Sequence, residues 1–299
     1  MKVTVASCQI DVSSLSMEKN IAACEEAVRR AAAEGAKICL LPELAVTGYT
    51  VACYNRRQAQ NALPFVARLA GLAQEQSVHI FAGFLREQDG RLRNTQGYFS
   101  PEGLSGMYFK NELVAHENLF AVPGSEPVIH GTPFGRIGCA ICKDMLYKDV
   151  FSPYRGRVDM MAISSAWPDF SRDYKRGPLG RAARHNDVLI RELPQRIARY
   201  VGAPVVYCDS WGGPHRLFGS DTWMIGGSSI VTPAGFVEKG VTTGEQTLMA
   251  EIELKNTGPA DDPAPWPSRG WLTPVLAAEH ALYKTAGFVR AAREKLHKG

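Results

Sequence analysis

The chain reads VTVASCQI at residues 3–10, EKNIAACEEAVRRAAAE at residues 18–34 and ICLL at residues 38–41. The outer two stretches are short apolar runs of strand length, whereas the middle one repeats apolar residues every three or four positions. Ser16 is placed to cap that helix and Gly35 to end it. The order strand, helix, strand is typical of an α/β layer fold.

The same alternation continues along the chain. Helical spacing predicts a second helix over 64–75, which leads into an apolar strand over 78–84. Asp89-Gly90 then gives a strong hairpin signal before a strand-like stretch at 97–99. Antiparallel strands should therefore join the parallel ones, and the pattern predicts an α/β fold with mixed sheets.

The second half of the chain repeats these signals with one interruption. Further strands are predicted at 136–142, 158–164, 204–208, 223–231 and 247–254, with a helix at 191–201. Residues 168–188 carry glycines, prolines and arginines without a clear period. We expect a long loop or a short-helix insertion there, and such segments in compact domains are often functional.

Length and composition favour one large domain with a small-molecule substrate. The 299 residues are 45% hydrophobic, which suffices for a single domain over 1–299 with a Pro-rich C-terminal tail from about 256. The net charge of +4 comes from 34 basic and 30 acidic residues without a long single-sign block. No nucleic-acid partner is expected from this pattern.

The N-terminus and the cysteines favour the cytoplasm. Residues 1–5 run straight into a strand pattern and lack the features of a signal peptide, and no apolar stretch approaches the roughly 18 residues that span a bilayer. Four of the seven cysteines lie in apolar runs, where a thiol serves as a small core residue. We expect no disulfide scaffold and no membrane partner, and reduced thiols leave a nucleophile available.

Cys142 stands at the end of the predicted strand Gly138-Cys139-Ala140-Ile141-Cys142, where the apolar pattern stops. Reactive groups in α/β folds commonly lie at the carboxyl ends of strands. A helix beginning there would favour the thiolate through its dipole. An inert core cysteine is the competing interpretation when Cys142 is taken alone.

Cys139 and Cys142 also form a C-x-x-C pair, which raises metal binding and redox chemistry as alternatives. Residues three apart on a strand point to opposite faces, which is poor geometry for a shared ion or a disulfide. No second pair or His cluster completes a zinc site. We therefore expect no metal.

Glu43 occupies a similar position, since it closes the stretch Ile38-Cys39-Leu40-Leu41-Pro42-Glu43. A carboxyl group at the edge of an apolar core tends to have a raised pKa, which suits a general base that works near neutrality. The alternative is a surface glutamate just past a strand. Further along, Lys110 is followed by Glu117 and by Pro123-Gly124, an order that is uncommon by chance.

Together these motifs resemble the nitrilase superfamily of carbon-nitrogen hydrolases. They are Leu41-Pro42-Glu43, Lys110-Asn111-Glu112-Leu113 with Glu117 and Pro123-Gly124, and Gly138 to Asp144, with Gly226 to Val231 as a later match. The resemblance runs from residue 3 to about 254. It implies a four-layer αββα sandwich of two mixed β-sheets, assembled as a homodimer or larger homo-oligomer.

The resemblance also implies a catalytic set of Glu43, Lys110, Glu117 and Cys142. Cys142 would be the nucleophile and Glu43 the general base, while Lys110 would hold the oxyanion and Glu117 would orient Lys110 and Glu43. Acyl transfer through a thioester then needs no cofactor.

Four further residues are candidates for substrate binding. Lys143, where many relatives have an aromatic or small polar residue, would offer its backbone N–H, and Trp167 lies where relatives often place a pocket residue. Arg172 would meet a substrate carboxylate, against the alternative of a solvated basic loop. His116 is a candidate because it precedes Glu117.

The favoured activity is amidase, on a small-molecule amide. Nitrilases of this family usually carry Trp-Glu after the nucleophile, whereas this chain has Lys143-Asp144. An N-carbamoyl amide hydrolase stays open, although Met145-Leu146 replaces the arginine pair of relatives that act on N-carbamoyl-D-amino acids. A catalytically silent scaffold member and an acyltransferase with a coenzyme A or glutathione acceptor are the remaining alternatives.

Overall fold

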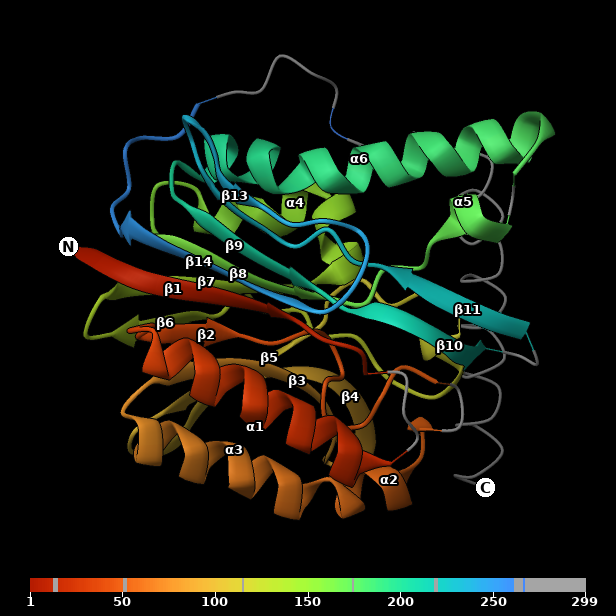
Figure 1. The fold of residues 1–299 in the computed structure, drawn as a ribbon, viewed down its shortest axis with the longest axis horizontal. Coiled ribbons are helices and arrows are strands. Elements are labelled where there is room, and N and C mark those ends of the chain that lie inside the picture. The colour runs from red at the N-terminus through yellow and green to blue at the C-terminus, as the bar shows by residue number, and fades with distance from the viewer. Residues whose placement is uncertain are drawn as a thin grey trace.

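Two six-stranded sheets pack face to face between outer layers of helices (Figure 1). The computed structural model describes residues 1–12, 16–50, 53–114, 116–173, 175–217, 220–260 and 266. Helices α1 (Met17–Ala33) and α3 (Leu63–Gln76) cover the outside of one sheet, and α4 (Lys148–Phe151) and α6 (Gly177–Val201) cover the outside of the other. The predicted four-layer αββα sandwich is confirmed.

The first sheet has the strand order β14-β1-β2-β3-β4-β5. Its strands are β1 (Lys2–Gln9), β2 (Ile38–Leu40), β3 (His79–Gln88), β4 (Arg91–Ser100), β5 (Gly103–Phe109) and β14 (Gln246–Glu253). Strands β1, β2 and β3 are parallel and the other pairs antiparallel, so the sheet is mixed as expected. The predicted hairpin at Asp89-Gly90 joins β3 to β4, and both turn residues have positive φ.

The second sheet has the order β13-β12-β9-β8-β7-β6. Its strands are β6 (Ile129–Thr132), β7 (Gly135–Ile141), β8 (Met160–Ser165), β9 (Val205–Asp209), β12 (Ser229–Thr232) and β13 (Gly235–Lys239). Here β7, β8 and β9 are parallel. A separate two-stranded ribbon is formed by β10 (Trp211–Leu217) and β11 (Ser220–Ile225).

Each sheet buries both of its faces, and most of the core falls into two apolar clusters. Between the sheets, Val5 and Phe81 of the first belong to one apolar cluster with Cys139 and Ile163 of the second. A second cluster joins the buried face of α1 to α3 and the first sheet. Ser16 caps α1 as predicted, since its side chain accepts a hydrogen bond from the Lys19 N–H.

Two sequence expectations need correction. The stretch 168–188 is not mainly a loop, because it forms α5 (Phe170–Asp173) and the first half of α6. Its buried face carries the polar Asn186 and Asp187, which hide the helical period. The strand predicted at 223–231 is split into β11 and β12 by Gly226 and Gly227, which both have positive φ.

The remaining elements are short. They are α2 (Arg56–Asn61) and the 3-10 helices η2 (Glu117–Leu119), η3 (Cys142–Leu146) and η4 (Ser152–Tyr154). No helix in the described part of the chain has the length and apolar character needed to cross a bilayer. The expected tail is described only to residue 260 and at Trp266, so most of it lies outside the described residues.

Candidate active site

Three of the four predicted catalytic residues come from strand ends of the two sheets, and the fourth comes from a connection. Glu43 follows β2 and Lys110 follows β5 in the first sheet, whereas Cys142 follows β7 in the second. Glu117 begins η2, in the connection between β5 and β6. All four side chains are fully or almost fully buried. The face-to-face packing of the sheets is therefore what brings the two halves of the site together.

Lys110 is the centre of the cluster. Its Nζ lies 2.6 Å from Glu43 Oε1 and 2.9 Å from Glu117 Oε2, and all three side chains have 0% exposure. A buried ion pair is stable only when its remaining donors and acceptors are satisfied. The cluster meets this condition through contacts to Asn94, Tyr54 and the backbone.

Asn94 of β4 bridges the two carboxylates. Its Nδ2 donates to Glu43 Oε1 at 2.7 Å and to Glu117 Oε1 at 2.6 Å. The Tyr54 hydroxyl donates to Glu117 Oε1 at 2.6 Å. These two residues were missed in the sequence. For Asn94 the signal was a polar residue at an inward position of a buried strand, which is costly without a partner.

Backbone N–H groups fix the other carboxylate oxygens. Glu43 Oε2 accepts from the Ala166 N–H at 3.0 Å, and Glu117 Oε2 accepts from the Val114 N–H at 2.8 Å. The Glu43 N–H in turn donates to the Ser165 carbonyl at 3.2 Å. Because residues 165 and 166 belong to the second sheet and its exit loop, Glu43 is held by both sheets.

The two carboxylates differ in their electrostatics. Burial favours the neutral form of Glu117, but Lys110, His116 and the Tyr54 hydroxyl outweigh it and hold the pKa of Glu117 at about 2. For Glu43, burial is the largest influence and the charge of Glu117 adds to it, so the pKa of Glu43 is raised despite Lys110. Glu117 is thus the permanent partner of Lys110, and Glu43 is the better proton acceptor.

Cys142 lies at a sharp corner between β7 and η3. It has φ +49°, in the left-handed region that residues with a Cβ rarely adopt. Burial raises the pKa of its thiol, with a further rise from Glu43 and a reduction from Lys110. The resting thiol is therefore neutral, and a base has to take its proton during attack. Cys139, three residues earlier, is a core residue inside β7.

His116 and Lys143 lie close to this cluster. The His116 ring packs edge-on against Tyr49 and Tyr54, with ring centroids 5.4 and 5.8 Å apart, and burial lowers its pKa to about 4. The Lys143 side chain is buried, and its ammonium donates to the Leu113 carbonyl at 3.2 Å. His116 thus presents a neutral ring beside Glu117.

Trp167 is part of the same region, whereas Arg172 is not. Trp167 is buried and follows Ala166, the residue that donates to Glu43, and its backbone N–H donates to Asp209 Oδ1 at 2.9 Å. Arg172 is exposed, and its guanidinium lies 3.7 Å from the centroid of the Trp223 ring. The structure therefore does not bring Arg172 to the four buried residues.

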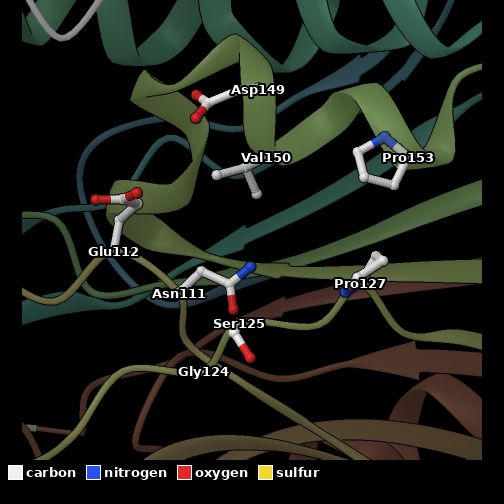
Figure 2. Close-up of a pocket in the computed structure, with 8 residues that line it drawn as sticks. All are labelled: Asn111, Glu112, Gly124, Ser125, Pro127, Asp149, Val150 and Pro153. Atoms are coloured by element: carbon white, nitrogen blue, oxygen red, sulfur yellow. The ribbon is translucent and has the colours of Figure 1, made fainter.

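A separate cavity lies beside Asn111 and Glu112, the two residues that follow Lys110. Figure 2 shows its lining, and its volume is about 250 Å³. The residues around it are Asn111, Glu112, Gly124, Ser125, Pro127, Asp149, Val150 and Pro153. It contains none of the four residues described above, so it is not the proposed catalytic pocket. In the described ranges, no three His, Cys, Asp or Glu side chains gather as metal ligands.

Comparison with known proteins agrees with this arrangement. The family model described as Carbon-nitrogen hydrolase matches residues 4–262. Omega-amidase NIT2 of Homo sapiens is 29% identical over 259 residues, which cover 83% of this chain and 87% of that protein. The chloroplastic omega-amidase of Arabidopsis thaliana is 26% identical over 269 residues, covering 84% and 68% of the two chains.

Solved structures show the same fold. A mutant of the Nesterenkonia AN1 amidase from the nitrilase superfamily superposes with a TM-score of 0.72 at 18% identity, covering 84% of this chain and 90% of that one. Saccharomyces cerevisiae Nit3 gives a TM-score of 0.69 at 21% identity, with the same coverage.

Proposed function

The chain belongs to the carbon-nitrogen hydrolase family, and from that premise we propose that it is a cysteine-dependent amidase acting through Cys142. The observation that carries the proposal is the buried Lys110 ammonium, held between Glu43 and Glu117 at 2.6 and 2.9 Å and electrostatically coupled to Cys142. A fixed buried cation beside a thiol can stabilise an oxyanion that develops next to the sulfur.

The first half of the reaction forms a thioester. Glu43 takes the proton of the Cys142 thiol while the sulfur attacks the amide carbonyl carbon. The Lys110 ammonium and the backbone N–H of Lys143 hold the oxyanion. When the intermediate collapses, the carbon-nitrogen bond breaks and Glu43 returns the proton to the departing ammonia or amine.

The second half regenerates the thiol. Glu43 accepts a proton from water as the water oxygen attacks the thioester carbon. The second intermediate then expels the sulfur, which recovers the proton from Glu43, and the acid leaves. Glu117 keeps Lys110 charged and in place throughout. A thiol and a positioned base suffice for this chemistry, so we propose no cofactor.

Small linear amides are the proposed substrates, with ω-amides first among them because the curated relatives include omega-amidases. His116 and Trp167 are proposed as pocket walls, since both are buried beside the catalytic cluster. N-carbamoyl compounds and nitriles are the alternatives within the family, and a silent scaffold member is the alternative outside enzymes. The buried ion cluster argues against the scaffold, because such a cluster is costly to keep without a role.

The test is ammonia release from a panel of simple amides, ω-amides, N-carbamoyl compounds and nitriles. We expect release from amides that is lost in Cys142→Ala and kept in Cys139→Ala, because Cys139 is a nearby buried cysteine of the core. Release from nitriles or carbamoyl compounds alone would replace the amidase proposal with that activity. A folded protein that releases no ammonia from any class would favour the scaffold.

We also propose the wider setting of the enzyme. The chain forms a single hydrolase domain over 1–299 with a C-terminal tail from about 256, and it associates as a homodimer or larger homo-oligomer. A cytoplasmic location is proposed because all seven cysteines are free, as in a reducing compartment. Light scattering after gel filtration tests the oligomer, and a monomer at micromolar concentration would contradict it.

A further inference from the structure

Asp144 is a buried carboxyl group next to the proposed nucleophile, and the mechanism above does not use it. It lies in η3, two residues after Cys142, and has 0% exposure. Its Oδ2 accepts a hydrogen bond from the Ile141 N–H at 2.8 Å. The Asp144 side chain therefore closes the corner at which β7 ends and Cys142 adopts its positive φ.

The same carboxyl group also reaches the segment that carries Lys110. Asp144 Oδ2 accepts from the Tyr108 hydroxyl at 2.7 Å, and Oδ1 accepts from the Glu112 N–H at 2.8 Å. Tyr108 stands two residues before Lys110 and Glu112 two residues after it. One side chain thus binds the chain on both sides of the buried cation and, through Ile141, the end of the strand that leads to the nucleophile.

The position of Lys110 depends on such contacts, because β5 ends at Phe109 and the strand ladder no longer holds the chain beyond it. Glu43 and Glu117 hold the Lys110 ammonium, whereas Asp144 holds the backbone on either side. A catalytic group has to be placed to within about 0.5 Å of its productive position. A displacement of about 1 Å can cost about 100-fold in rate.

The three contacts suit an ionised carboxylate. The Ile141 N–H, the Tyr108 hydroxyl and the Glu112 N–H all act as donors, and a carboxylate only accepts. Burial raises the pKa of Asp144 to about 7, although each of the three donors lowers it. The ionised form is therefore favoured above neutral pH.

We propose that Asp144 is a positioning residue of the hydrolase, which holds the Lys110 segment in register with the Cys142 corner and so places the cation for the oxyanion. The inference rests on the proposed roles of Cys142 and Lys110. Asp144 acts through its three donors and not on the substrate. Its replacement should lower kcat more than it raises KM, because the oxyanion contact is strongest in the transition state.

The test compares two reactions of Cys142 that differ in their need for Lys110. In the first, an aldehyde adds to the thiol: the sulfur bonds to the carbonyl carbon, the oxygen takes up the electron pair beside Lys110, and Glu43 takes the thiol proton. In the second, iodoacetamide alkylates the same sulfur and forms no oxyanion. The aldehydes are acetaldehyde and succinic semialdehyde, which correspond to a simple amide and to an ω-amide.

Both reactions are read in one assay at pH 8, with peptide mapping of Cys142. The alkylation rate is measured first without aldehyde, and the aldehyde concentration that halves this rate then gives its Kd. Asparagine has one acceptor oxygen, so in Asp144→Asn its amide nitrogen faces a donor. We expect the aldehyde Kd to rise about 10- to 100-fold, and the alkylation rate to fall by a smaller factor.

Asp159→Asn is the control for this variant. Asp159 accepts a hydrogen bond from the Arg136 N–H at 2.9 Å, at the opposite end of β7 from Cys142. The aldehyde Kd and the alkylation rate of Asp159→Asn should both match the wild type.

Tyr108→Phe answers the question even if Asp144→Asn does not fold. It keeps the ring and removes one of the three donors, so the aldehyde Kd should rise about three- to tenfold, as expected for one hydrogen bond. Its control is Tyr154→Phe. Tyr154 is equally buried, and its hydroxyl donates to the Cys139 carbonyl of β7 at 2.8 Å. This variant should bind the aldehyde as the wild type does.

An aldehyde Kd that is unchanged in Asp144→Asn and Tyr108→Phe would overturn the inference. A fall in alkylation as large as the loss of aldehyde affinity would also overturn it, because that result indicates a general disturbance of the site. If neither aldehyde protects Cys142 of the wild type, the proposed nucleophile fails and the inference with it. A protein that shows the expected Kd changes but hydrolyses no amide would refute the proposed activity alone.

Discussion

The ammonium of Lys110 lies between two buried carboxylates that do not share it equally. Glu117 receives additional donors from Tyr54 and Val114, and its pKa is about 2. Glu43 faces the charge of Glu117, and its pKa is raised. Glu117 is thus a permanent counter-ion of Lys110, and Glu43 is a proton acceptor. Proteins often assign acid and base roles to two similar side chains in this way, by giving them different environments.

This division predicts the acid limb of the pH profile. Only ionised Glu43 can accept a proton, so kcat/KM should fall as pH drops through its raised pKa, above the ordinary value of 4.5. The Asn94 amide lowers the pKa of Glu43. In Asn94→Leu, the acidic fall of kcat/KM should therefore move to higher pH. The measurement is kcat/KM against pH, with the amide that the wild type hydrolyses fastest.

Thr95→Val is the matched control for this prediction. Thr95 is the next residue of β4 and is equally buried, and its hydroxyl donates to the Arg93 carbonyl of the same strand. Its profile should match the wild type. If kcat/KM of Asn94→Leu falls at the same pH as in the wild type, or at a lower pH, Glu43 is not the group whose ionisation controls the reaction.

Sequence reasoning found the side chains that carry charge and missed those that hold them. Glu43, Lys110, Glu117 and Cys142 stand in recognisable motifs. Asn94 has no motif, because its role is defined by Glu43 and Glu117, which are 51 and 23 residues away along the chain.

At the level of elements, the turn after β2 sets the position of Glu43. Strand β3 passes directly beneath this turn, where the Gly83 N–H donates to the Pro42 carbonyl and the Val46 N–H donates to the Gly83 carbonyl, both at 3.1 Å. A Cβ on Gly83 would lie 2.6 Å from the Pro42 carbonyl oxygen. Glycine at this position allows the close approach of strand and turn.

Gly83→Ala should therefore displace the turn. We expect a loss of about 1–3 kcal/mol in the free energy of unfolding, with a fall in kcat, because backbone atoms cannot move aside cheaply. Urea denaturation and ammonia release measure the two effects. The control is Gly71→Ala inside α3, where no atom lies within 4 Å of the added Cβ.

The two variants should change stability in opposite directions. Gly71→Ala should gain about 0.5–1 kcal/mol, because alanine has the higher helix propensity, and it should leave kcat unchanged. If Gly83→Ala is as stable and active as the wild type, the contact between β3 and the turn does not position Glu43.

Helices and strands with a regular apolar repeat were predictable from the sequence. Those whose repeat is interrupted were not. Helix α1 and the β3–β4 hairpin follow local signals, namely a cap at Ser16 and the turn at Asp89-Gly90. For the first half of α6 the sequence predicts only a long loop or a short-helix insertion, because the helical period is broken by the polar, buried Asn186. Tertiary packing can override a weak local pattern in this way.

At the scale of the whole molecule, the site exists only where the two sheets meet. Ser164 of β8 connects them, since its hydroxyl donates to the Leu41 carbonyl at 2.8 Å and accepts from Gln96 Nε2 at 2.7 Å. Leu41 lies two residues before Glu43, and Ser164 pairs with Ile141, the residue before Cys142. This contact sets the position of the base relative to the nucleophile.

Ser164→Ala should loosen that junction. The Leu41 carbonyl and the Gln96 amide would each lose a buried partner, which costs about 1–3 kcal/mol of stability. Activity should fall with it, because Glu43 and Cys142 lie on opposite sides of the junction. Urea denaturation and kcat measure both effects.

Ser152→Ala is the control, since Ser152 is exposed and its hydroxyl contacts Tyr200 on the outer helical layer. It should change stability by less than about 0.5 kcal/mol. Full activity in Ser164→Ala would mean that the register of the sheets does not depend on this residue. The pairing across the sheets could not be predicted from the sequence, because no local pattern encodes which inward residues face each other.

The most direct test of the account is competitive labelling of the seven cysteines with iodoacetamide at neutral pH, resolved by peptide mapping. Of the seven cysteines, Cys142 is the one whose electrostatics include Glu43 and Lys110, and Glu43 can take its proton during attack, so Cys142 should react at least about tenfold faster than any other cysteine. Excess amide substrate should protect it, and Glu43→Gln should slow it. Uniform labelling, or faster labelling of another cysteine, would contradict the assignment of Cys142 as the nucleophile.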